Sequence, residues 1–221
     1  TVHIPDGIIM AADSRLTGSR WINNAQPDTP KIVQEYTLSD CSQKVVLMHK
    51  SPIGISSCGD AMLNGLTVSD YLRQFEIDCM EHRDTVAETA RKLNKQLAGK
   101  TFNANFVVAG YDNDTPYVYD VSKEQVSRVN MLENGDISYG AHWNGRIEAV
   151  DRLFNCQPRT NFPWNVMQLK DGADLAEFIV DVTIKYERFA EGIQTCGGPI
   201  DVLIITKDDA FWYRHKVFAH Q

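Results

Sequence analysis

Two kinds of hydrophobic pattern follow one another along the chain. Short apolar runs bounded by polar turns are typical of β-strands, whereas apolar positions three and four residues apart are typical of helices. The first pattern predicts strands over residues 7–12, 31–36, 44–49, 53–57, 105–111, 116–121, 125–129, 137–140, 200–206 and 210–218. The second predicts helices from Asp60 through Phe75, from Asp84 to Gly99, over 144–154 and over 173–190.

The order of these elements bears on the fold class. Strand groups and helix pairs follow one another as strands, two helices, strands, two helices, strands. Two sheets with apolar faces each need a cover, and the inserted helix pairs supply it. We therefore predict an α+β fold, a four-layer α-β-β-α sandwich with two mainly antiparallel sheets. No linker or repeat divides the chain, so we expect a single domain over residues 1–221.

Composition narrows the class of protein. The 221 residues are 43% hydrophobic and 23% charged, as in ordinary globular proteins. The net charge of −7 argues against nucleic acid as a partner, because no basic excess is present to neutralise phosphates. No apolar run approaches the roughly 18 residues of a membrane span, and no signal peptide is visible. Five cysteines without a C-x-x-C spacing favour reduced thiols in a cytoplasmic protein over disulfides or a metal site.

The chain begins with Thr1, and an N-terminal threonine has distinctive chemistry. Its α-amine has a pKa of about 7.7–8.0, so near neutral pH the amine can accept the hydroxyl proton and activate the oxygen as a nucleophile. A nearby lysine would lower the pKa of the amine, and an aspartate would hold that lysine in place. Asp13, after the first long strand, and Lys31, at the start of the next, are candidates for these roles. Each residue also has an ordinary structural explanation, as a chain start, a turn or a solvated strand end.

Six stretches, in order, resemble the β-type proteasome subunits and their bacterial relatives in the N-terminal nucleophile hydrolase superfamily. They read GIIMAADSR, PKIV, IGISSCGDA, VVAGYD, GDISYGAHWNG and CGGPIDVLIIT. The resemblance covers nearly the whole chain and agrees with the order of elements in the predicted sandwich. It implies a threonine-type peptidase that cleaves amide bonds through an acyl-enzyme, which water then hydrolyses, with no cofactor and no metal.

Carried over residue by residue, the resemblance makes Asp13 the buried acid and Lys31 the active-site lysine. The nucleophile is then Thr1 or a threonine just upstream of it. The loop that supplies backbone N–H groups to the oxyanion and lines the substrate pocket corresponds to Ser56, Ser57, Cys58 and Gly59. Small residues let backbone donors approach a developing oxyanion closely, and they also allow tight packing between a strand and the following helix.

The chain departs from the family pattern at three places. Thr1 lies twelve residues before Asp13, where the family has about sixteen. Four residues of extended chain span roughly 13 Å, so Thr1 would fall short of the lysine on this register. Ala141 stands where the family has a serine, and Ile193 and Cys196 stand where it has an aspartate and a second serine. Those groups support proton handling at the amine, which Ala141 and Ile193 cannot do.

Three functions therefore remain open. The first is a peptidase that acts on peptide or protein substrates within a homo-oligomeric ring or stacked assembly, with an ATPase unfoldase left open as a partner. The second is a non-catalytic assembly subunit of the same fold, and the third is an amidase for small amides that works alone or as a dimer. The presence of both Asp13 and Lys31 favours a hydrolase.

Overall fold

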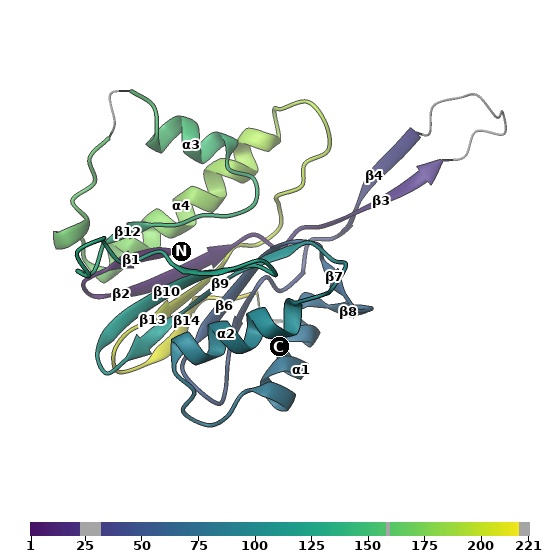
Figure 1. The fold of residues 1–221 in the computed structure, drawn as a ribbon. Coiled ribbons are helices and arrows are strands. Elements are labelled where there is room, and N and C mark those ends of the chain that lie inside the picture. The colour runs from purple at the N-terminus through teal and green to yellow at the C-terminus, as the bar shows by residue number, and fades with distance from the viewer. Residues whose placement is uncertain (23–31, 158–159, 217–221) are drawn as a thin grey trace, which may run out of the picture.

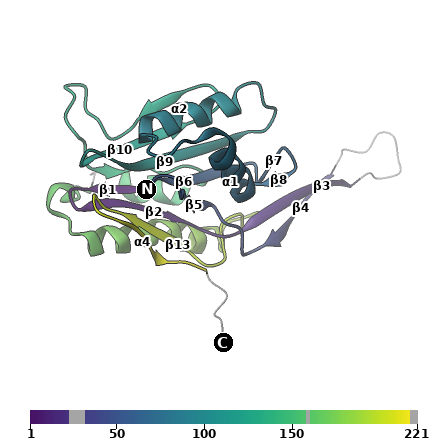
Figure 2. The same cartoon turned by 90° about the horizontal axis from the view of Figure 1, so that it is seen from below.

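The computed structural model describes residues 1–22, 32–157 and 160–216. These residues form a mixed α+β structure in which two five-stranded antiparallel sheets lie face to face, as Figure 1 shows. Helices cover the outer face of each sheet (Figures 1 and 2). The α+β class and the antiparallel sheets agree with the expectation from the sequence.

The first sheet carries the N-terminal strands. Its strand order is β12-β1-β2-β13-β14, with bounds Gly140–Ala141, Val2–Ile4, Gly7–Ala12, Asp201–Ile205 and Ala210–Arg214. Helix α4 (Leu169–Glu187) packs on its outer face, accompanied by α3 (Glu148–Phe154) and the short 3₁₀ helix η1 (Trp164–Val166). Buried Val2, Ile4 and Ile9 meet Ala173 and Ala176 of α4, so strand and helix bury each other's apolar side.

The second sheet has the order β11-β10-β9-β6-β5. The bounds of these strands are Val126–Arg128, Thr115–Val121, Ala104–Asp112, Gly54–Gly59 and Val45–Leu47. Helices α1 (Val68–Cys79) and α2 (Val86–Leu97) cover its outer face. Thr85 and Glu88 form a reciprocal capping box at the start of α2, which satisfies backbone N–H groups that the first helical turn leaves free.

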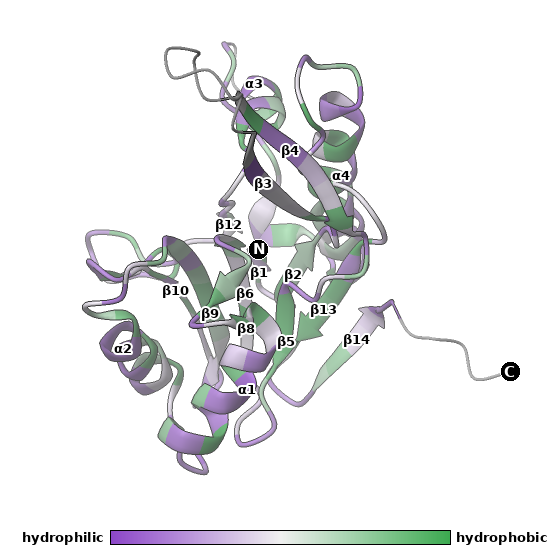
Figure 3. Cartoon of the chain, turned by 90° about the vertical axis from the view of Figure 1, so that its right-hand side faces the viewer, coloured by the Kyte–Doolittle hydropathy of each residue, from purple (hydrophilic) through white to green (hydrophobic). Residues whose placement is uncertain are grey.

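The inner faces of the two sheets share a separate apolar core. It includes Ile8, Met10 and Leu203 from the first sheet and Val107 from the second. Figure 3 shows the corresponding strands, β2 and β13, as largely hydrophobic. A Cβ at Gly54 would lie 2.5 Å from the sulfur of Met10, so a glycine here allows the sheets to approach closely.

Two small hairpins lie outside these sheets. Strands β3 (Leu16–Ile22) and β4 (Ile32–Ser39) form a two-stranded ribbon that projects from the body of the molecule (Figures 1 and 3). Strands β7 (Met62–Leu63) and β8 (Leu66–Thr67) are joined by Asn64 and Gly65, both with positive φ, as a two-residue hairpin turn requires.

Several predicted boundaries were wrong for identifiable reasons. The helix expected from Asp60 begins at Val68 with Thr67 as its cap, because the intervening residues form the β7–β8 hairpin. The helix expected from residue 144 begins at Glu148. The strand expected over 137–140 is reduced to Gly140–Ala141 and an isolated bridge at Ile137. Within the described residues, every helix is too short or too polar to cross a membrane.

Candidate functional site

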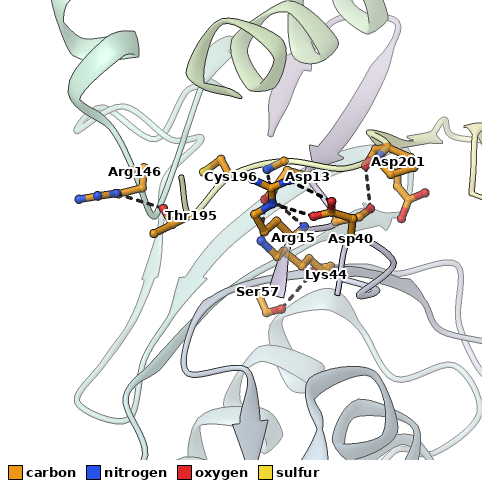
Figure 4. A network of polar contacts seen from close by, with 12 residues as sticks. Asp13, Arg15, Asp40, Lys44, Ser57, Arg146, Thr195, Cys196 and Asp201 are labelled. Atoms are coloured by element: carbon orange, nitrogen blue, oxygen red, sulfur yellow. Dashed lines mark hydrogen bonds and ion pairs between the residues drawn. The ribbon is translucent and has the colours of Figure 1, made fainter. Parts of the chain in front are cut away.

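Asp13 is the charged centre of the site. It directly follows β2 and is 8% exposed. One carboxylate oxygen accepts the Lys44 ammonium at 2.6 Å, and the other accepts the backbone N–H groups of Gly197 at 2.9 Å and Arg15 at 3.0 Å. Figure 4 shows Lys44 and Arg15 beside Asp13. Charge-assisted hydrogen bonds from three segments of the chain hold it in one orientation.

The structure gives Asp13 a lysine partner, Lys44, that the sequence interpretation did not choose. Lys31 lies outside the described residues. Lys44 immediately precedes β5, a core strand of the second sheet, whereas β4 pairs only with β3 in the projecting ribbon. The sequence contained the relevant signal, because the predicted strand over 44–49 also opens with a lysine.

A second ion pair closes the base of the ribbon. The Arg15 guanidinium holds both oxygens of Asp40, at 2.6 and 2.9 Å. The hydrogen bond from Arg15 lowers the pKa of the Asp40 carboxyl below its usual range. Arg15 and Asp40 flank β3 and β4, so this pair joins the two ends of the inserted segment close to Asp13.

Thr1 lies at the start of β1 and pairs with the segment after β12. Its amine donates to the His142 carbonyl at 2.8 Å, and the His142 N–H donates to the Thr1 carbonyl at 2.8 Å. Burial lowers the pKa of the Thr1 amine to about 5, so the amine is neutral at pH 7. A neutral amine retains the lone pair that a general base needs.

The predicted oxyanion stretch lies beside Lys44. Ser56, Ser57, Cys58 and Gly59 occupy the second half of β6, and the Ser57 N–H donates to the Lys44 carbonyl at 2.9 Å. Gly59 has φ +98°, and a Cβ there would lie 2.4 Å from the Asn103 carbonyl oxygen. Only glycine fits this bend, which follows the proposed donors directly.

One cavity brings these residues together. It has a volume of about 430 Å³, and its lining includes Thr1, Asp13, Lys44, Ser56, Ser57, Cys58 and Gly59. The structure therefore places the predicted Thr1, Asp13 and oxyanion stretch around a common space. Lys44, which is paired with Asp13, lines the same space.

The cavity also lies beyond Thr1 along the direction of β1. Strand β1 lies between β2 and β12, and its pairing with β2 reaches Val2 opposite Ile9. Strand β2 runs on through Ala11 and Ala12, which pair with β13 on their other side. Those two alanines line the cavity on one side, and the segment of residues 142–145 lines it on the other.

The loop before β13 forms another wall. Glu187, at the end of α4, accepts the backbone N–H groups of Thr195 at 2.7 Å and Cys196 at 2.8 Å. Arg146 donates to the same carboxylate at 2.8 Å. Burial and the charges of Asp13 and Glu187 raise the pKa of the Cys196 thiol to about 12, so it stays protonated at neutral pH.

A histidine pair, which the sequence interpretation did not place in the site, lies near the Thr1 amine. His142 Nε2 is 3.8 Å from the Asp120 carboxylate, which also accepts a 3.1 Å hydrogen bond from Asn144. Burial, the neighbouring amine and His142 lower the pKa of His3 to about 4. The His3 imidazole is therefore coupled electrostatically both to the amine of the first residue and to His142.

Comparison of the sequence with models of protein families and with curated proteins gives no match. Among the described residues, no three His, Cys, Asp or Glu side chains gather closely enough to hold a metal ion.

Proposed function

We propose that this chain is a threonine-type N-terminal nucleophile hydrolase of the β-type proteasome kind, with the four-layer sandwich of that superfamily. The observation that carries the proposal is the Asp13–Lys44 pair at 2.6 Å. This pair lies at a cavity that is also lined by the small residues of β6 and by Thr1, just before β1. The substrate would be a peptide or protein amide bond.

The mechanism follows from the chemistry of these groups. The α-amine of the nucleophilic threonine takes the hydroxyl proton while the oxygen attacks the substrate carbonyl. The Lys44 ammonium, held by Asp13, stabilises negative charge on the attacking oxygen. Backbone N–H groups of the stretch through Cys58 and Gly59 would stabilise the oxyanion. The amine returns its proton to the leaving nitrogen, and water then hydrolyses the ester.

The nucleophile in this proposal is Thr1 or a threonine just upstream of it. The open space beyond Thr1, bounded by Ala11 and Ala12 on one side, supports the upstream position, because residues that extend β1 would occupy it. The family spacing of about sixteen residues before Asp13 supports the same position. In either case, the mature protein must carry a free amine on that threonine.

A non-catalytic assembly subunit is the second candidate. Ala141 and Ile193 bring no proton-handling group, and the raised pKa of Cys196 makes its thiol a poor substitute. Exposed aromatic side chains on and after α4, Phe178 at 48% and Phe189 at 84%, support an assembly through the outer helices. A homo-oligomeric ring or stack in the cytoplasm, with or without an ATPase unfoldase, fits both candidates.

The decisive experiment labels the mature protein with a threonine-directed inhibitor that reacts with a hydroxyl and its adjacent α-amine. Peptide mass spectrometry should locate one adduct, on the N-terminal residue. Lys44→Met should abolish labelling, whereas Lys185→Met, which removes an exposed lysine paired with Asp181, should leave it unchanged. A free N-terminal threonine without an adduct would reject the hydrolase and favour the assembly subunit.

A further inference from the structure

A buried ion pair lies behind the site, outside the cavity. Asp201, the first residue of β13, is 1% exposed, and the side chain of Lys216 is 12% exposed. The Lys216 ammonium contacts one oxygen of Asp201, and its backbone N–H donates to the other at 2.8 Å. His215 adds a contact at 3.1 Å to that second oxygen and stacks on Trp212 with ring centroids 4.1 Å apart.

The ammonium of Lys216 also reaches the residue next to Asp13. It donates to Ser14 Oγ at 2.7 Å, and Ser14 is completely buried. The Ser14 hydroxyl donates in turn to the Pro199 carbonyl at 2.7 Å. Lys216 is therefore bonded at once to the start of β13 and to the residue after Asp13.

Ser14 connects all the segments that orient the Asp13 carboxylate. Its N–H donates to the Gly197 carbonyl at 2.9 Å, and the N–H of Gly197 donates to Asp13. Its own carbonyl accepts the Ser42 N–H at 2.9 Å, two residues before Lys44. In Figure 4, Asp201 lies on one side of the Asp13–Lys44 pair and Thr195 lies on the other.

We propose that Lys216 is a positioning residue, which through Ser14 fixes the relative placement of Asp13 and Lys44. Its importance for the reaction rests on the proposed hydrolase function, but the geometric claim does not. Without the Lys216 bonds, Ser14 keeps only its links to the two loops, and the loop carrying Lys44 gains freedom relative to Asp13. The ammonium of Lys44 then becomes more accessible to solvent and reagents.

The first test measures the reactivity of Lys44 rather than activity. The double variant Lys216→Met with Asp201→Asn removes both charges, because a single change would leave a buried charge unpaired. Ser14→Ala breaks the same link by deleting one hydroxyl. In both variants we expect acetic anhydride to acylate Lys44 several-fold faster, as read by peptide mass spectrometry. Lys185→Met is the control and should leave that rate unchanged.

A kinetic measurement then connects the geometry to the reaction. Misplacement of a catalytic group by about 1 Å can reduce the rate about 100-fold, so we expect kcat to fall at least tenfold while KM changes less. Thermal unfolding of each variant confirms that it is folded. Unchanged Lys44 acylation in folded Ser14→Ala would overturn the inference. Faster acylation in the variants, together with no activity in the wild-type protein, would reject the proposed function and leave the positioning role of Lys216 intact.

Discussion

Lys44 Nζ lies 2.6 Å from Asp13 Oδ1, although 31 residues separate them along the chain. The pair joins the end of β2 in one sheet to the start of β5 in the other. A link between the sheets stabilises the fold, and in the proposed mechanism it also contributes to catalysis; mutation can separate the two contributions.

Lys44→Met is expected to reduce both activity and stability. Loss of the cation removes charge stabilisation at the nucleophile, which typically costs about 100-fold to 1000-fold in kcat. The Asp13 carboxylate loses one charged hydrogen bond but keeps two backbone donors, so the free energy of unfolding should fall by roughly 1.5–3 kcal/mol. Amide hydrolysis and urea denaturation measure the two effects. Full activity in folded Lys44→Met would contradict the assigned role.

The stability of a sample whose first residue is Thr1 should rise with pH between about 5 and 8. Burial lowers the pKa of the Thr1 amine from 8.0 to about 5, so within this window the unfolded chain binds a proton that the folded chain does not. Stability is therefore lost as the pH falls toward 5. Urea denaturation across the range measures this.

His3 acts in the same direction at lower pH. Its pKa falls from 6.5 to about 4, so it destabilises the fold as the pH drops through that interval. His3→Gln should flatten the profile between about 4 and 6.5 and leave the region from 7 to 8 unchanged. A profile that is flat in the wild-type protein would show that neither group is buried as described.

Ala141→Ser should increase the rate of a functional hydrolase. Ala141 lies in β12 and pairs with Val2, next to the strand that carries the nucleophile in the proposed mechanism. A hydroxyl there adds a proton-handling group near the amine, and general acid–base assistance contributes up to about 100-fold or more. Ala61→Ser, which adds a hydroxyl to the cavity lining, should have no such effect. Equal measurable rates for both variants and the wild type would refute the role given to a hydroxyl at position 141, whereas no hydrolysis by any of the three would argue for a non-catalytic subunit.

Gly59→Ala should destabilise the protein far more than Gly135→Ala. Both glycines have positive φ, +98° and +89°, and an alanine in that region costs about 1–2 kcal/mol. At Gly59 the new Cβ would also meet a backbone oxygen at 2.4 Å, whereas at Gly135 no atom lies within 4 Å. Thermal unfolding of the two variants separates steric cost from conformational cost. Equal destabilisation would mean that the β6 bend can relax.

The sequence predicted the strands of the core well, because their apolar runs are unambiguous. The runs from Gly7 to Ala12 and around Asp201–Ile205 both became central strands, and Asp13 lies where its position after a buried strand suggested. Local patterns of this kind reflect the burial of consecutive residues. A short stretch of sequence shows this burial directly as an apolar run.

The partner of Asp13 could not be predicted in the same way. Whether Lys31 or Lys44 begins a strand of the core depends on which strands pair over long distances. Hydrophobic periodicity carries no information about strand pairing. The predicted start of the first helix was wrong for a local reason. Asn64-Gly65 is a sequence signal for a tight turn, but the prediction included these two residues in the helix.

The ion pair between Arg15 and Asp40 lies where the ribbon of β3 and β4 joins the site. Because the two ends of the ribbon are tied together at the point where they leave the body, the distance between Asp13 and Lys44 does not depend on the outer part of the ribbon, although Leu16 and Thr17 at its base line the cavity. That segment can differ in length or contact another molecule while the distance across the site stays the same. The ribbon is thus the part of the chain in which new binding properties can arise at least cost to the chemistry.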